Sequence, residues 1–272
     1  MVVADSCARC TNYIFTDYGQ HSGIVLLLGA VTFAFQIYCD FSAYSDIAVG
    51  VAHLLGISLM RNFANPYFSR DIAEFWRRWH ISLTTWFRDY LYIPLGGSRG
   101  STWQKIRNVF AVFLVSGFWH GANLTFIVWG LVHACFFLPL LVAGQNRRYT
   151  GCVAAGRLFP SLTELCQIGL TFLLVTSAWI FFRADNISMA SSYLWRIMTC
   201  SGGLGLRGLG NGLVPPFWVG ILMCVEWFSR EYGHGLARLP ARRSIRWCLY
   251  CLLFTTIVLF RSSRQSFIYF QF

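Results

Sequence analysis

Runs of apolar residues, each separated from the next by a shorter polar stretch, dominate the chain. One helical crossing of a membrane needs about 20 such residues. Five runs reach or approach this length, and they cover residues 22–39, 109–142, 165–182, 214–229 and 247–260. A weaker sixth run, residues 41–60, contains Asp46 and His53. Because a helix satisfies its own backbone in lipid, the pattern predicts an all-α protein, a polytopic transmembrane helical bundle with interfacial or re-entrant helices.

Residues 61–107 interrupt this pattern with eight basic and three acidic residues. Ser69 is suited to cap a helix, and Pro94 with the glycines after it is suited to end one. The sequence therefore predicts a helix over residues 70–92. One face would carry an aromatic stripe made of Trp76, Trp79, His80, Leu83, Phe87 and Tyr90. Arg77 and Arg88 are 11 residues apart, about three turns, and would share another face. We expect this helix to lie in the membrane interface on the cytoplasmic side.

The apolar run at 109–142 is too long for one crossing. Residues 109–146 contain no Asp, Glu, Lys or Arg, and as one helix they would extend about 57 Å against a hydrocarbon core of about 30 Å. We expect a break within residues 116–123, where glycines flank His120. Two passes there would place a second basic cluster, Arg230, Arg238, Arg242, Arg243 and Arg246, on the cytoplasmic side as well. A re-entrant segment at residues 187–198 would also place this cluster on the cytoplasmic side.

Composition supports the membrane assignment. Hydrophobic residues make up 56% of the chain and charged residues 12%, whereas soluble domains carry about 25% charged residues. The net charge of +11 fits cytoplasmic loops better than nucleic acid, because RNA-binding signatures are absent. Two Cys-x-x-Cys pairs, Cys7/Cys10 and Cys248/Cys251, lack the further ligands of a zinc site, so we expect no metal. Residues 1–21 form a polar N-terminal segment without signal-peptide features, and nothing divides residues 22–272 into further domains.

His120 is the first candidate for chemistry. A neutral imidazole is tolerated inside a membrane, and its reference pKa near 6.5 suits proton transfer. The alternative is a packed histidine that links two helices by hydrogen bonds. His80 has a similar alternative as an interfacial anchor, and His133 is expected to be a core or helix contact. Asp40 and Asp46 either line a polar cavity or join two helices. The nucleophile-elbow, P-loop and dinucleotide-binding motifs are absent.

Several segments taken together resemble one family. These are FQIYCDFSAYSDIAVG (35–50), NPYFSRDIAEFWRRWHISLTTWFRDYLYIPLGG (65–97), SGFWHGANLTFIVWGLVHA (116–134), WIFFRAD (179–185) and FIYFQF (267–272). They resemble the membrane-bound O-acyltransferases, and most of all their bacterial alginate O-acetyltransferase-like branch. Ala43 stands where that branch commonly has Gly.

The resemblance implies an acetyltransferase with a tunnel through the bacterial inner membrane. Such an enzyme moves an acetyl group from a cytoplasmic thioester, with acetyl-CoA as the expected donor, to a hydroxyl of an exported or cell-surface polysaccharide. The family's central histidine falls on His120, which would act as general base, and its second histidine on His80. A separate extracytoplasmic acetyltransferase partner is implied. Arg77, Arg78 and Arg88 would hold donor phosphates, or would instead snorkel towards the lipid surface.

Family members begin with further transmembrane helices before the matching segment. We therefore expect residues 22–272 to be the C-terminal catalytic part of such an enzyme, derived from a truncated gene, a fragment or a split enzyme. The first alternative function is a truncated non-catalytic membrane fragment or a scaffold for partner proteins. The second is a transporter or channel, which would use Asp40, Asp46 and the histidines but would leave the long motif at 65–97 unexplained.

Overall fold

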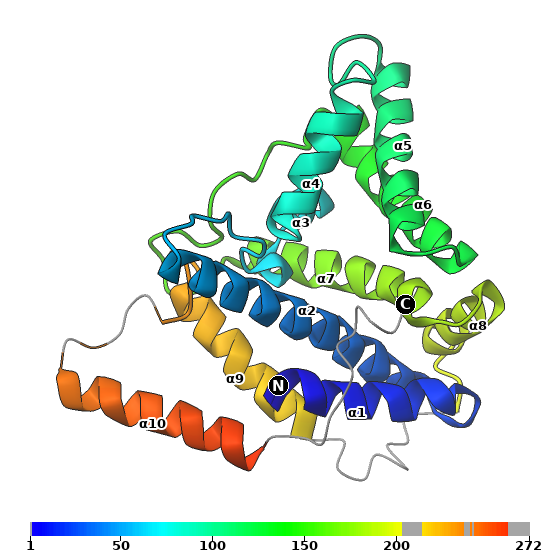
Figure 1. The fold of residues 1–272 in the computed structure, drawn as a ribbon. Coiled ribbons are helices and arrows are strands. Elements are labelled where there is room, and N and C mark those ends of the chain that lie inside the picture. Colours follow the sequence, from blue (N-terminus) through cyan, green and yellow to red (C-terminus); the bar gives the residue numbers. More distant parts are fainter. Residues whose placement is uncertain (1, 203–213, 237–239, 241, 261–272) are drawn as a thin grey trace. The chain divides into compact units, whose positions relative to one another are not determined.

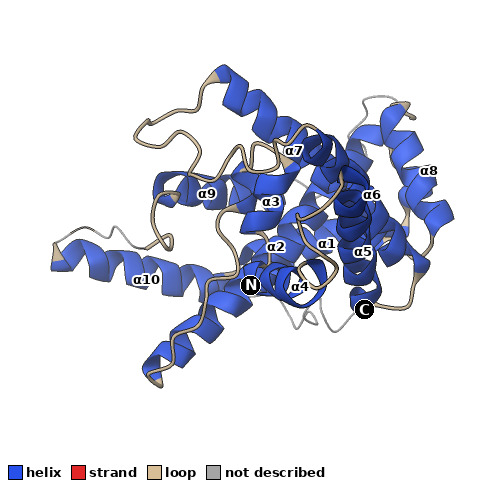
Figure 2. Ribbon diagram, turned by 90° about the horizontal axis from the view of Figure 1, so that it is seen from above, coloured by secondary structure: helices blue, strands red, loops and turns tan. Residues whose placement is uncertain are grey.

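Every regular element in the described part of the chain is a helix (Figure 2). The computed structural model describes residues 2–202, 214–236, 240 and 242–260. Two parts of the sequence named above, Arg238 and the segment 267–272, lie outside the described residues. Within the described residues, three helices are long and apolar enough to cross a membrane, namely α2 (Gly23–Leu54), α6 (Leu124–Val142) and α7 (Leu162–Arg183). The predicted all-α membrane fold is thus confirmed.

The chain forms two compact units, one from Met1–Ala43 and Arg196–Phe272, the other from Tyr44–Trp195. The first contains α1 (Val2–Thr16), the start of α2, α9 (Val214–Ser229), α10 (Arg243–Leu259) and the short helix η1 (Tyr18–Gln20). Helix α1 packs against α9 and bonds to α2 through the Thr11 and Thr32 hydroxyls, 3.0 Å apart. In the same unit, the Tyr38 hydroxyl of α2 donates to Glu226 of α9.

The second unit contains the remainder of α2 and the elements that carry both candidate histidines. Its elements are η2 (Pro66–Phe68), α3 (Ile72–Arg78), α4 (Ile81–Phe87), the π-helix η3 (Arg88–Tyr92), α5 (Thr102–His120), α6, α7 and α8 (Ile187–Met198), the last up to Trp195. Figure 1 shows α5 and α6 as a pair beside α3 and α4. Helix α6 also packs on α7.

Helices α5 and α6 form an antiparallel hairpin that breaks at the predicted place. Helix α5 ends at His120, and α6 begins after Asn123, whose side chain accepts a hydrogen bond from the Thr125 N–H. Two glycines allow close packing, because a Cβ at Gly117 would collide with the Phe126 carbonyl and a Cβ at Gly130 with the Phe113 carbonyl. The break confirms that the apolar run makes two helices rather than one.

The predicted continuous helix over residues 70–92 is wrong. The helix cap is Asp71, whose side chain accepts from the Glu74 N–H, whereas the Ser69 hydroxyl donates to the Pro66 carbonyl. The helix stops at Arg78 because a neighbouring segment takes its backbone bonds. Ala64 N–H donates to the Arg78 carbonyl at 3.0 Å, and Ile81 N–H donates to Asn62 at 2.9 Å.

His80 sits at this break in the left-handed region, with φ 42° and ψ 57°. The chain then resumes as α4 and widens into a π-helix from Arg88. Arg77 and Arg88 consequently belong to different helices and do not share a face. The aromatic stripe is likewise divided at His80, so its first part faces the α5–α6 hairpin through Trp76.

Candidate functional site

Four aromatic rings enclose His120 at the end of α5. Its ring centroid lies 5.0 Å from Trp119, 5.3 Å from Trp129, 5.0 Å from Phe182 and 6.4 Å from Phe126. The first three rings stand at 76–89° to the imidazole. We call this set the His120 enclosure. It provides the apolar surroundings in which electrostatic interactions and hydrogen bonds strengthen.

Three helices supply the rings of the enclosure, with Trp119 next to His120 on α5 and the other rings on α6 and α7. Phe126 and Trp129 lie three positions apart on one face of α6, and Phe182 comes from α7. Trp129 is 1% exposed and stacks on Trp179 of α7, with centroids 5.6 Å apart. The sequence analysis selected His120 but missed these rings. The three-residue spacing of Phe126 and Trp129 could have identified the two α6 rings. Phe182 is distant in the sequence and reaches His120 only through the packing of α7.

His80 lies beside the same enclosure. Its ring is 6.5 Å from Trp119 and is stacked on Phe63, 6.4 Å away at 11°. Burial lowers the pKa of His80 to about 4, so the imidazole is neutral at physiological pH. His80 and His120 are close enough to interact electrostatically. The structure therefore brings together the two histidines, although 40 residues separate them in the sequence.

His133 is a fully buried helix contact, which agrees with its expected role. The Trp76 Nε1–H of α3 donates to His133 Nδ1 at 3.3 Å. On its other side His133 meets Trp129, with centroids 5.1 Å apart. Trp129 thus lies between the two histidines of the hairpin, His120 and His133, and its position depends on α3 as well as on α6 and α7.

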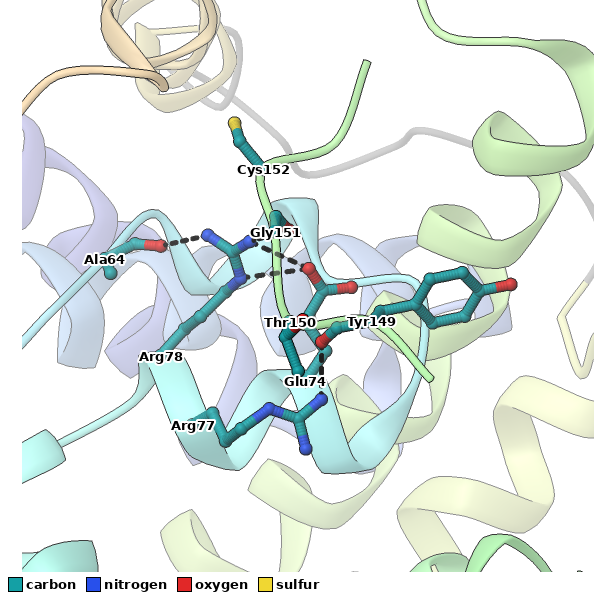
Figure 3. A pocket seen from close by; sticks show the side chains of 8 residues that line it. All are labelled: Ala64, Glu74, Arg77, Arg78, Tyr149, Thr150, Gly151 and Cys152. Carbon is teal, nitrogen blue, oxygen red and sulfur yellow. Dashed lines mark hydrogen bonds and ion pairs between the residues drawn. The ribbon is translucent and has the colours of Figure 1, made fainter. Parts of the chain in front are cut away.

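Arg77 and Arg78 line a pocket of about 360 Å³ (Figure 3). The other lining residues are Ala64, Glu74, Tyr149, Thr150, Gly151 and Cys152. Arg77 donates to the carbonyls of Asn146 and Tyr149, at 2.7 and 2.6 Å. Arg78 donates to Glu74 at 2.8 Å and to the carbonyls of Ala64 and Gly151 at 3.0 and 2.9 Å. Both guanidinium groups therefore already hold the protein's own backbone.

Arg88 does not join this pocket. Its side chain is exposed and forms an ion pair with Asp89, at 2.7 Å. The three predicted donor-binding arginines are therefore not gathered at one place. Among the described residues, no cluster of three or more His, Cys, Asp or Glu side chains is suited to hold a metal ion.

The fold and the site together define a helical membrane protein with a partly buried histidine as its candidate base. Residues 14–189 match the family model of MBOAT, the membrane-bound O-acyltransferase family. This segment includes His80, His120 and the whole enclosure, and the chain belongs to this family.

Named relatives include a probable alginate O-acetylase of Pseudomonas aeruginosa, 44% identical over 195 residues, which are 72% of this chain and 34% of the relative. A protein of the same name in Azotobacter vinelandii is 41% identical over 85% of this chain and 44% of its own length. The peptidoglycan O-acetyltransferase of Helicobacter pylori is 32% identical over 100% of this chain and 54% of its own length. The chain thus spans about a third to a half of the relatives it matches.

Proposed function

We propose that this protein is the histidine-bearing part of an O-acetyltransferase that modifies an exported or cell-surface polysaccharide. The observation that carries the proposal is the placement of His120 at the turn of the α5–α6 hairpin, inside the aromatic enclosure and next to His80. The names of the relatives, alginate O-acetylase and peptidoglycan O-acetyltransferase, support acetyl transfer to a glycan hydroxyl.

The chemistry requires a base. An alcohol is a weak nucleophile, and a positioned general base typically accelerates such a reaction about 10²–10⁴-fold. In our proposal His120 takes the proton of the acceptor hydroxyl as its oxygen attacks the carbonyl carbon of the thioester. His80 assists on the donor side. Neutral imidazoles suit both positions, since a cation would be costly in an apolar enclosure.

The donor in this proposal is acetyl-CoA, which enters from the cytoplasm, and the protein resides in a bacterial inner membrane. Arg77 and Arg78 contribute to donor binding through the N–H groups that remain after their backbone contacts, and Arg88 through its exposed position. An extracytoplasmic acetyltransferase passes the acetyl group on to the polysaccharide. The two basic residues of the pocket support the donor assignment, because guanidinium groups bind phosphates well.

The test is the His120→Ala variant in the organism's own membrane. We expect surface polysaccharide to lose its O-acetyl groups, measured by NMR of the purified polymer, while immunoblots show unchanged protein abundance. His234→Ala is the matched control, because His234 is an exposed histidine outside the site, and it should leave acetylation at the wild-type level. Normal acetylation in His120→Ala, combined with lost acetylation when the gene is deleted, would favour the scaffold function instead.

A further inference from the structure

The buried indole N–H of Trp129 donates no hydrogen bond to the described part of the chain. The Trp129 side chain is 1% exposed, so bulk solvent does not reach this group. A buried polar group without a hydrogen bond costs about 1–3 kcal/mol, and native structures keep few of them. The Trp129 N–H therefore remains available to a group that binds beside His120.

The neighbouring indoles show what is particular to Trp129. Trp76 is packed into the same cluster, but its N–H donates to His133 Nδ1. Trp179 also has a buried N–H with no bond to the described residues, yet its ring contacts Trp129 and Phe182 rather than His120. Trp129 alone among these three indoles combines an unused N–H with direct contact to His120, at 5.3 Å between centroids.

We propose that the Trp129 N–H stabilises the oxyanion of the acyl-transfer reaction, an inference that rests on the function proposed above. The acceptor oxygen bonds to the thioester carbonyl carbon while its proton passes to His120. The electron pair of the C=O bond moves to the carbonyl oxygen, which accepts a hydrogen bond from Trp129. When this pair returns, the C–S bond breaks, and the leaving thiolate takes the proton back from His120. An ester and a free thiol result.

The surroundings suit this role. A donor that stabilises an oxyanion is most effective when it is fixed in advance and shielded from water. Stacking on Trp179 and ring contacts with His133 and Trp76 hold the Trp129 ring in place. The donor is neutral, so it does not raise the cost of the apolar enclosure as an arginine or lysine would.

The experiment replaces Trp129 by Phe, which keeps a ring in the cluster and removes the N–H. Membranes that contain the full chain at matched abundance are given radiolabelled acetyl-CoA, and acetyl transfer to the endogenous polysaccharide is followed. We expect kcat to fall about 10²–10³-fold, the usual effect of losing one oxyanion donor, with KM for acetyl-CoA within about threefold of the wild type. Trp103→Phe is the control, because Trp103 is an exposed indole at the start of α5, at the opposite end of this helix from His120, and its kcat should stay within about threefold.

The outcomes separate this inference from the proposed function. Wild-type kcat in Trp129→Phe together with an inactive His120→Ala overturns the role of Trp129 and leaves the general base standing. Activity in His120→Ala overturns the proposed function itself. If Trp129→Phe fails to accumulate, 3-benzothienylalanine at position 129 keeps the ring size and replaces N–H by sulfur. A loss of kcat in that variant supports the inference, and wild-type kcat contradicts it.

Discussion

Glu74 joins the charged residues around α3, and at 1% exposure it is one of the most deeply buried carboxylates described. It accepts hydrogen bonds from Arg70 at 2.9 Å and from Arg78 at 2.8 Å. Both guanidinium groups also bond to the Gly151 carbonyl. One carboxylate thus binds two arginines, and these arginines connect the α3 region to the segment after α6. The sequence showed only that Glu74 lay among basic residues.

Replacing Glu74 by Ala should leave Arg78 without its counter-charge and Arg70 with only its longer contact to Glu164, at 3.7 Å. Removal of one partner of a buried ion pair typically costs about 3–5 kcal/mol, so we expect a large fall in the unfolding temperature of the detergent-extracted protein, measured by intrinsic fluorescence. Asp89→Ala is the control, because its ion pair with Arg88 is exposed and its loss should leave this temperature unchanged. Equal behaviour of the two variants would contradict the role given to Glu74.

At the scale of elements, the α5–α6 hairpin decides where His120 lies. Its two helices approach so closely that their contact surface contains glycine, at Gly117 facing the Phe126 carbonyl and at Gly130 facing the Phe113 carbonyl. Small residues are typical of close helix contacts in membranes, where packing rather than water exclusion drives association. The hairpin is therefore sensitive to added volume at two positions that touch no substrate.

Gly117→Ala should force the helices apart, because the new Cβ meets rigid backbone atoms. Overpacking of this kind costs about 1–3 kcal/mol, and we expect a lower unfolding temperature and weaker acetylation at matched abundance. Gly169→Ala is the matched control, since Gly169 lies within α7 with open space around its Cβ position. It should be neutral or stabilising by about 0.5–1 kcal/mol. A Gly117→Ala protein as stable as Gly169→Ala would show that the contact is not tight.

At the scale of the whole molecule, the antiparallel hairpin constrains sidedness. The segment before α5 and the segment after α6 end on the same membrane face, whatever depth the turn at His120 reaches. Both are basic, with Arg99, Lys105 and Arg107 near the start of α5 and Arg147 and Arg148 after α6. By the positive-inside rule we expect this face to be cytoplasmic.

Reporter fusions test this arrangement. Green fluorescent protein joined after Arg99 or after Arg148 should fluoresce in cells, and alkaline phosphatase joined at the same two positions should be inactive. For each reporter, the fusions after Arg99 and after Arg148 should give the same signal, because the hairpin returns the chain to the side on which it started. Opposite signals at the two positions would contradict the antiparallel pairing of α5 and α6 within the membrane.

The sequence predicted the parts of the fold that depend on local length and composition. The break near His120 followed from the length of one apolar run against the thickness of a bilayer. The break at His80 could not be predicted, because Asn62 and Ala64 take backbone bonds that a longer helix would have kept. The candidate base was identifiable from its motif, whereas the ring of Phe182 reaches it only through the packing of α7.

The long sequence separation of the α3 arginine contacts also limits when they can form during synthesis. Arg77 bonds to carbonyls that follow it by 69 and 72 residues, a distance that a ribosome covers in roughly 4 to 14 seconds. The α5–α6 hairpin joins near neighbours in the chain and is complete once residue 142 has emerged. The hairpin can therefore pair before residues 146 and 149 emerge, and the Arg77 contacts of α3 can form only after them.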